Sequence, residues 1–131
     1  MERIRKVVDW NAEGLRGKRV LVAEDEAIIA LDVELMLEDA DVEVIGPHAS
    51  LSSLMDAIDG VTPDAALLDV RLGRDEVYPA ARELSRRGVP MIFHSGHCDR
   101  STLLALFPNA QACPKPCSGP QLLRALAGMV H

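Results

Sequence analysis

Charged and hydroxyl side chains follow four short apolar runs of the chain. In sequence order, Glu24-Asp25-Glu26 follows Arg19–Ala23, Asp69 follows Ala65–Leu68, His94-Ser95-Gly96 follows Met91–Phe93, and Lys115 comes shortly after Gln111–Cys113. If these runs are strands of an open parallel sheet, their carboxyl ends share one edge, where such sheets bind ligands. We therefore expect the carboxylates of Glu24, Asp25 and Asp69, a hydroxyl and a lysine to meet there.

This set of side chains suits phosphoryl transfer. Carboxylates packed together repel one another unless a cation neutralises them. Mg²⁺ fits, because it binds through one or two carboxylates together with waters and phosphate oxygens. An Asp carboxylate beside Mg²⁺ can act as a nucleophile toward phosphorus and form an aspartyl phosphate. Lys115 and the Ser95 hydroxyl would then stabilise the oxygens of the transferred group.

Five predicted strands alternate with five predicted helices. The strands are Arg19–Ala23, Val42–Ile45 (stopped by Gly46-Pro47), Ala65–Leu68, Met91–Phe93 and Gln111–Cys113. The helices run from about Glu26 to Asp39, from Ser50 or Ser52 to Ile58, from Tyr78 to Arg87, from Asp99 or Ser101 to Pro108, and from Gln121 to Met129. This alternation predicts an α/β fold with a doubly wound parallel sheet covered on both faces.

Two of these helices are rich in apolar residues. Ile28, Leu31 and Leu35, with Ile29 and Met36 beside them, recur at helical spacing among acidic residues, which predicts an amphipathic helix with a solvated acidic face that includes Glu26. Leu103, Leu104, Leu106 and Phe107 give the fourth helix more apolar surface than one face needs. We expect a partner or a second copy of the chain to contact that helix.

Length and charge point to one domain that does not bind nucleic acid. The chain has 131 residues and a net charge of −6, which fits a short N-terminal extension over residues 1–17 and one domain over residues 18–131. Residues 20–79 carry 15 acidic and two basic side chains. An acidic excess of this size disfavours a nucleic-acid surface.

The sequence also predicts a cytoplasmic protein. The apolar runs are shorter than the roughly 18 residues that a membrane span needs, and the first residues do not resemble a secretory signal. Three cysteines, an odd number, favour reduced thiols over a disulfide framework.

The ordered set Glu24-Asp25, Asp69, Ser95 and Lys115-Pro116 resembles the receiver (CheY-like) domain of response regulators in two-component signalling. The resemblance runs from about Arg19 to the end of the chain. It implies the flavodoxin-like fold with strand order 2-1-3-4-5. It also implies a phosphoacceptor signalling domain rather than an enzyme, in which Asp69 takes a phosphoryl group, with Mg²⁺, from the phosphohistidine of a sensor histidine kinase or a phosphotransfer protein.

The same resemblance implies a role for each site residue. Asp25 would be a direct metal ligand, and Glu24 would act on the metal through water or through another ligand. Asp69 and the backbone carbonyl of Arg71 would also belong to the metal site. Ser95 would be the switching hydroxyl and Lys115 the partner of the phosphoryl group. The peptide bond between Lys115 and Pro116 is usually cis in the family.

Residues 69–81 and 89–97 further resemble a subgroup of small receivers that carry a Phe-Ala-Thr-Gly segment, found alone or attached to other signalling modules. Here His94 replaces the Ala and Ser95 replaces the Thr. Arg71 and His97 hold the positions that flank the phosphoryl group and tune its lifetime in this family. Ala112 holds the place of an aromatic residue whose rotamer follows phosphorylation. The signal must therefore reach a downstream protein by another route, which we expect to be the Ser95 loop and the fourth helix.

Four other interpretations are open. A flavoprotein would need a Ser, Thr and Gly phosphate loop where Glu24-Asp25-Glu26 stands, and these carboxylates would repel a phosphate. A phosphatase of the haloacid dehalogenase type would need an acid where Arg71 stands. Cys113 and Cys117 suggest zinc or redox chemistry, although their spacing is not a common zinc spacing. The serious alternative is a receiver-like module that binds partners without being phosphorylated.

Overall fold

The computed structural model describes residues 12–96 and 99–130. The helices are α1 (Ala12–Leu15), α2 (Ala27–Asp39), α3 (Leu51–Gly60), α4 (Tyr78–Arg86), α5 (Arg100–Leu106) and α6 (Gly119–Met129). The strands are β1 (Arg19–Ala23), β2 (Glu43–His48), β3 (Ala65–Leu68), β4 (Arg71–Leu72), β5 (Asp75–Glu76), β6 (Met91–Ser95) and β7 (Gln111–Pro114). Of the predicted N-terminal extension, residues 1–11 lie outside the described part of the chain.

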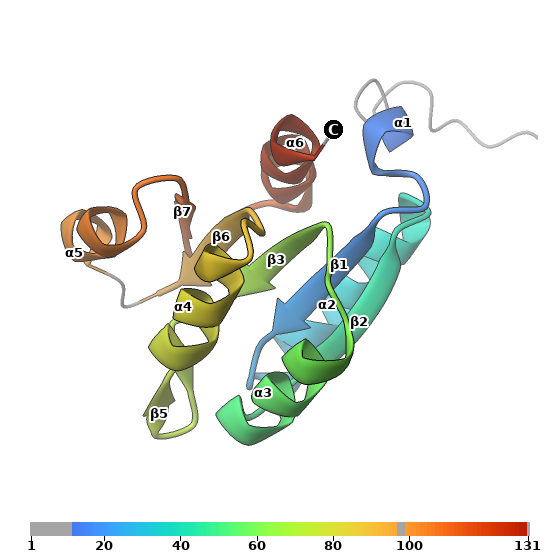
Figure 1. Cartoon of the computed structure of the whole chain (residues 1–131). Coiled ribbons are helices and arrows are strands. Elements are labelled where there is room, and N and C mark those ends of the chain that lie inside the picture. Colours follow the sequence, from blue (N-terminus) through green and yellow to red (C-terminus); the bar gives the residue numbers. More distant parts are fainter. Residues whose placement is uncertain (1–11, 97–98, 131) are drawn as a thin grey trace, which may run out of the picture.

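A parallel five-stranded sheet forms the centre of the molecule, in the order β2-β1-β3-β6-β7 (Figure 1). This order confirms the predicted flavodoxin-like order 2-1-3-4-5. The inner strands β1, β3 and β6 are buried almost throughout, as expected for parallel strands covered on both faces. Their carboxyl ends therefore share one edge of the sheet, as the candidate site requires.

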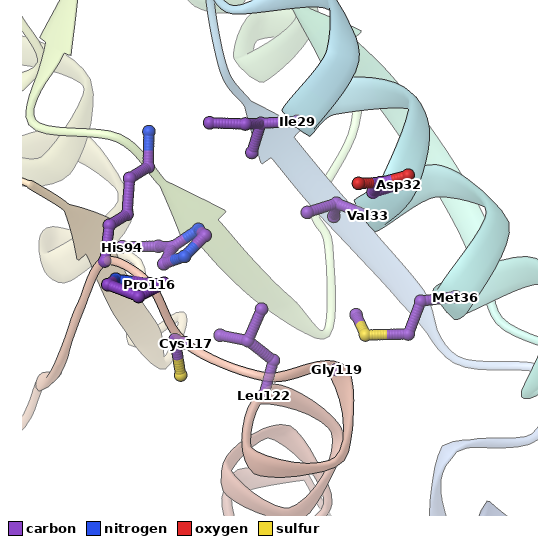
Figure 2. A pocket seen from close by; sticks show the side chains of 10 residues that line it. Ile29, Asp32, Val33, Met36, His94, Pro116, Cys117, Gly119 and Leu122 are labelled. Atoms are coloured by element: carbon purple, nitrogen blue, oxygen red, sulfur yellow. The ribbon is translucent and has the colours of Figure 1, made fainter.

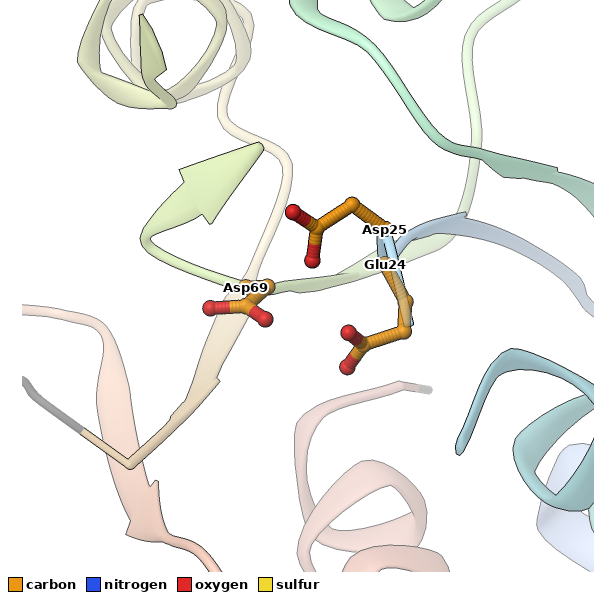
Figure 3. A group of neighbouring side chains, drawn as sticks. All are labelled: Glu24, Asp25 and Asp69. Atoms are coloured by element: carbon orange, nitrogen blue, oxygen red, sulfur yellow. The ribbon is translucent and has the colours of Figure 1, made fainter. Parts of the chain in front are cut away.

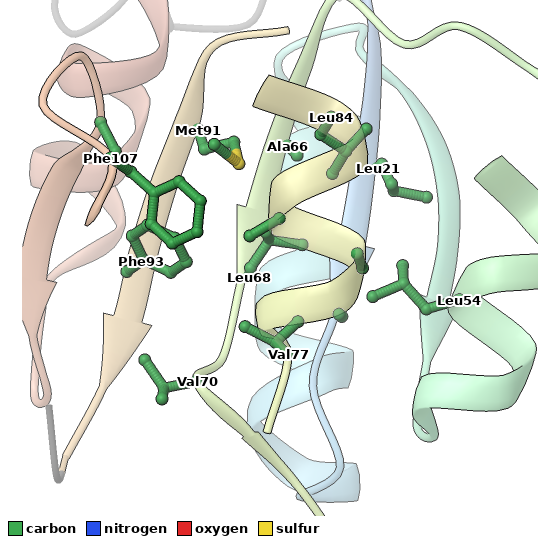
Figure 4. Close-up of a cluster of buried hydrophobic side chains, with 14 of the residues drawn as sticks. Leu21, Leu54, Ala66, Leu68, Val70, Val77, Leu84, Met91, Phe93 and Phe107 are labelled. Atoms are coloured by element: carbon green, nitrogen blue, oxygen red, sulfur yellow. The ribbon is translucent and has the colours of Figure 1, made fainter. Parts of the chain in front are cut away.

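Helices bury one core on each face of the sheet. On one face, α3, α4 and α5 cover residues such as Leu21, Leu68 and Phe93 (Figure 4). On the other face, α2 and α6 cover a second group that includes Val22 and Leu67. Since neighbouring residues of one strand point to opposite faces, Leu67 and Leu68 anchor β3 in both cores just before Asp69.

Strands β2 and β6 of the main sheet end later in the chain than the sequence predicts. β2 does not stop at Gly46-Pro47 but continues to His48, with a shift of register opposite Leu21–Ala23. Gly46 has φ of 113°, and a Cβ there would lie 2.8 Å from the carbonyl oxygen of Val22, so glycine lets the strand bulge and go on. β6 includes Ser95 as its last residue, where the sequence places it after the strand.

A small antiparallel hairpin follows β3 and was not predicted. β4 pairs with β5, and Gly73 in the turn between them has a positive φ of 65°. Strands of two residues are too short to leave an apolar periodicity in the sequence. The hairpin brings the backbone of residues 71–73 back toward the carboxyl end of β1.

The prediction for the apolar face of α2 is wrong. Val33 and Leu37 are the buried residues of this helix, whereas Ile28, Leu31 and Leu35 are 79%, 53% and 55% exposed. The three exposed side chains, which we call the α2 stripe, follow the spacing of a single helix face. The sequence contains two apolar faces on this helix, and the sheet covers only one of them.

The expected apolar surface on the fourth predicted helix is smaller than the sequence indicates. Leu103 and Phe107 are buried, and Leu104 is half-buried. Leu106 is the only one of the four that is exposed, with 49% of its surface accessible. A contact between two copies at α5 stays a prediction. None of the helices in the described ranges is long and apolar enough to cross a membrane.

Leu68→Ala tests the anchoring of β3. Leu68 is fully buried, so we expect the substitution to lower the free energy of unfolding by about 2–5 kcal/mol. Leu106→Ala is the matched control, because its side chain is half-exposed and its loss should change stability by about 0.5 kcal/mol or less. Urea unfolding followed by circular dichroism measures both, and equal effects would contradict the burial of Leu68 in the core.

Candidate functional site

Three carboxylates meet at the carboxyl ends of β1 and β3. An oxygen from each of Glu24, Asp25 and Asp69 lies within 4.8 Å of the other two (Figure 3). Glu24 and Asp69 are buried, with 4% and 6% of their surface exposed, whereas Asp25 is exposed. The predicted acidic cluster is therefore present, with two carboxylates set into the protein and one at its surface.

The sheet positions the two buried acids through their own backbone. The Glu24 amide donates to the carbonyl of His48 at 2.9 Å, and the Asp69 amide donates to the carbonyl of Ala23 at 2.9 Å. These bonds extend the strand ladders by one residue beyond β1 and β3. Glu24 and Asp69 thus directly follow the last residues of β1 and β3, as the sequence predicts.

Lys115 connects the buried carboxylates. Its Nζ lies 2.9 Å from Glu24 Oε1 and 2.9 Å from Asp69 Oδ2, and 3.4 Å from Oε1 of the exposed Glu26. The Lys115 amide donates to the carbonyl of Ser95 at 3.1 Å, which ties the loop after β7 to the end of β6. The bond between Lys115 and Pro116 is cis, as the resemblance implies.

Burial and charge oppose each other in this cluster. Burial raises the pKa of Glu24, and the negative charge of Asp69 adds to the rise, while the hydrogen bond from Lys115 lowers it. Burial by itself would lower the pKa of Lys115, but the hydrogen bonds to Glu24 and Asp69 outweigh it and raise that pKa. Lys115 is therefore a permanent cation at neutral pH, and one ammonium faces several carboxylates.

Backbone amides of the hairpin segment complete the site. The Arg71 amide lies 3.2 Å from Asp69 Oδ1, and the Gly73 amide donates to Asp25 Oδ2 at 2.7 Å. The second contact was missed in the sequence, because a donated backbone N–H leaves no trace in residue type. The glycine at position 73 is a local signal in the sequence for this turn, because glycine readily adopts the positive φ found there.

The remaining predicted site residues lie around this cluster. Ser95 is buried at the end of β6, next to the segment that carries Lys115. The side chain of Arg71 is exposed. Ala112 pairs with Phe93 in the sheet and is half-buried. His97, expected to flank the phosphoryl group, lies outside the described residues.

In the described part of the chain, cysteine and histidine side chains do not gather into a group that could hold zinc. Within residues 12–96 and 99–130, Glu24, Asp25 and Asp69 are the only group of three or more His, Cys, Asp or Glu side chains close enough to share an ion. Cys113 and Cys117 are free thiols. Burial and then the hydrogen bond with Cys113 raise the pKa of Cys117 to about 11, so its thiol stays protonated at neutral pH.

Known proteins resemble the chain over most of its length. No protein-family model matches it. The transcriptional regulatory protein PdtaR of Mycobacterium tuberculosis is 31% identical over 83 residues, which cover 63% of this chain and 40% of that protein. The match thus spans less than half of its curated relative.

Two solved structures share the fold. A response regulator receiver protein from Sinorhizobium medicae is 26% identical, with a TM-score of 0.78 over 88% of this chain and 95% of that one. The receiver domain of the sensor histidine kinase PA1611 from Pseudomonas aeruginosa is 24% identical, with a TM-score of 0.73 over 86% of this chain and 97% of that one. The latter holds a magnesium ion in its active site cleft.

Lys115→Met tests the charge balance of the cluster. Losing the ammonium leaves Glu24 and Asp69 buried without their cation, so we expect the free energy of unfolding to fall by about 3 kcal/mol at pH 7 without divalent ions. A raised carboxyl pKa means that the folded state binds more protons than the unfolded state. The deficit should therefore shrink as the pH falls through the raised pKa of Glu24.

Urea unfolding at several pH values, in the presence of a chelator, measures this effect. Arg82→Met is the control, because Arg82 is an exposed cation on α4 and its loss should cost about 0.5 kcal/mol or less. A deficit that is the same at every pH would mean that Lys115 contributes packing rather than charge.

Proposed function

We propose that the chain is a response regulator receiver (CheY-like) domain, which it resembles in sequence and fold, and that Asp69 accepts a phosphoryl group in two-component signalling. The donor is the phosphohistidine of a sensor histidine kinase or a phosphotransfer protein in the cytoplasm. One observation carries the proposal: a buried aspartate at a strand end shares the ammonium of Lys115 with Glu24, while Asp25 stands within ligand distance of both. The domain is a signalling domain, and we propose that its phosphorylation alters contacts with a downstream protein.

The donor atoms of the cluster fit Mg²⁺. All three groups are carboxylates, the hard oxygen ligands that this ion prefers. Their combined charge exceeds the single positive charge of Lys115, so a divalent cation would relieve the repulsion between them. The magnesium ion in the Pseudomonas receiver domain supports the same assignment. We propose that Glu24, Asp25, Asp69 and the backbone carbonyl of Arg71 hold it, and when bound it would neutralise phosphoryl oxygens.

Asp69, Lys115 and Ser95 have different roles in the proposed phosphoryl transfer. An oxygen of Asp69 attacks phosphorus, the bond between phosphorus and the histidine nitrogen breaks, and its electron pair stays with the imidazole of the donor. Lys115 already lies 2.9 Å from Asp69 Oδ2 and would stabilise the negative oxygens of the incoming group. The buried Ser95, on the strand next to Asp69, supplies a hydroxyl that can bind the same group after transfer.

The α2 stripe supports a protein as the phosphoryl donor. α2 begins directly after Glu26, whose carboxylate lies 3.4 Å from Lys115 Nζ. A protein that brings a phosphohistidine to Asp69 must therefore lie against this end of α2. Three exposed apolar side chains on one helix face are more than a solvated helix needs, and we propose that the donor protein covers them.

Ala112 favours one alternative, a receiver that signals without phosphorylation. A small side chain in the place of the usual aromatic residue removes one known route from the phosphorylated site to the surface. The Mg²⁺-type acid cluster and Lys115 support the phosphoacceptor instead, because an interaction module has no use for buried charges at a strand end.

Incubation with Mg²⁺ and acetyl phosphate separates the two functions. We expect the wild-type chain to gain the mass of one phosphoryl group, and beryllofluoride with Mg²⁺ to shift its amide resonances around Asp69 and Ser95. Asp69→Ala should abolish both effects. Asp56→Asn, at an exposed position on α3, is the control and should behave like the wild type.

A mass gain that survives in Asp69→Ala would contradict the assignment of the acceptor. If the wild type gains no mass and shows no shifts, a phosphorylated histidine phosphotransfer protein from the same cell provides the second donor. No transfer from either donor would favour the phosphorylation-independent module.

Leu31→Glu tests the donor surface. A charge in the α2 stripe should slow transfer from a phosphotransfer protein by on the order of tenfold, as expected when an apolar contact worth about 1.4 kcal/mol is lost. Reaction with acetyl phosphate should stay unchanged, because a small donor needs no helix contact. Leu106→Glu on α5 serves as the control. Equal slowing with both donors would show that the substitution disturbs the site rather than the docking surface.

A further inference from the structure

An apolar pocket of about 520 Å³ lies between α2, α6 and the loop that follows β7 (Figure 2). Ile29, Val33 and Met36 of α2 form one wall, and Leu122 of α6 and Pro116 face them. The proposed transfer of a phosphoryl group does not use this pocket. Pockets of about 300–1,000 Å³ with apolar walls and a few polar groups are typical of sites for small molecules.

His94 gives the pocket a buried polar group. Its side chain reaches from β6 into the pocket (Figure 2), and the residue is only 6% exposed. Nε2 of His94 has no hydrogen-bond partner within residues 12–96 and 99–130. An unpaired polar atom at this depth is unfavourable, so a ligand with an atom that pairs with Nε2 would bind more tightly than a purely apolar one.

The residues that line the pocket indicate which chemical class of ligand it can bind. Burial, and then the nearby ammonium of Lys115, lowers the pKa of His94, so the ring is neutral at pH 7 and pairs with a neutral group. A hydroxyl can both donate and accept, and so it can pair with Nε2 in either tautomer. Met36 supplies a flexible thioether that makes favourable contacts with aromatic rings. Asp32 at the rim disfavours an anion.

We propose that this pocket binds a small neutral aromatic alcohol, with its ring between α2 and α6 and its hydroxyl on His94 Nε2. The ligand would pack against the stem of Lys115, which also lines the pocket, while the ammonium of that lysine remains on Glu24 and Asp69. The proposal does not depend on phosphorylation of Asp69, since the binding groups are separate from the carboxylates.

Titration of the full chain with 2-naphthol, followed by methyl NMR, tests the proposal. We expect saturable shifts of the methyl groups of Ile29, Val33, Met36 and Leu122. Naphthalene, at matched concentrations, lacks the hydroxyl and should bind about tenfold more weakly, which corresponds to the loss of one hydrogen bond. His94→Phe should remove this difference, so that both probes bind with affinities within about twofold of each other.

A second variant separates loss of the pocket from loss of the fold. Ile29→Trp fills the pocket from a half-buried position on α2 and should abolish binding of both probes while the amide spectrum stays folded. Leu106→Trp, on the exposed side of α5, should bind 2-naphthol like the wild type. The proposal is overturned if neither probe gives saturable shifts, if the shifts lie elsewhere, or if naphthalene binds the wild type as tightly as 2-naphthol.

Discussion

The contact of one lysine with two buried carboxylates is the constraint on which the site depends. Glu24 and Asp69 are buried at the ends of neighbouring strands, and burial raises the pKa of Glu24. The Nζ of Lys115 lies 2.9 Å from each of them, and Lys115 follows β7, which is two places from β3 and three from β1 in the sheet. The sheet order therefore brings the ends of β1, β3 and β7 to one edge, where the single side chain of Lys115 contacts both carboxylates.

Most of this arrangement could be predicted from the sequence. The strand runs are apolar and end on charged residues, and parallel strands place those ends together. The strand order came from the family resemblance, and the sheet confirms it. Residue type and position after a strand together predict that four side chains meet at one edge of the sheet: Glu24, Asp25, Asp69 and Lys115. The proximity of these side chains is shown, whereas their roles in phosphoryl transfer stay proposals.

The remaining features depend on interactions that residue type does not record. The contact between the Gly73 amide and Asp25 is made by the backbone, and the strands that position it have two residues each. β2 passes Gly46-Pro47 because the positive φ of Gly46 permits a bulge there, although the same residues ordinarily stop a strand. The exposure of the α2 stripe was missed because helical periodicity identifies apolar faces but does not say which of two faces the sheet covers.

Helix α2 has one apolar face that packs on the sheet and a second apolar face that is exposed, and the fold does not need the second one. Val33 and Leu37 hold the helix on the sheet, so Ile28, Leu31 and Leu35 are not required for the core and are available to a partner. The same helix forms one wall of the His94 pocket through Ile29 and Met36. A partner on the stripe and a ligand in the pocket would therefore contact adjacent sides of one helix. α2 begins directly after Glu26, whose carboxylate lies 3.4 Å from Lys115 Nζ, so one end of this helix adjoins the lysine that contacts the carboxylates.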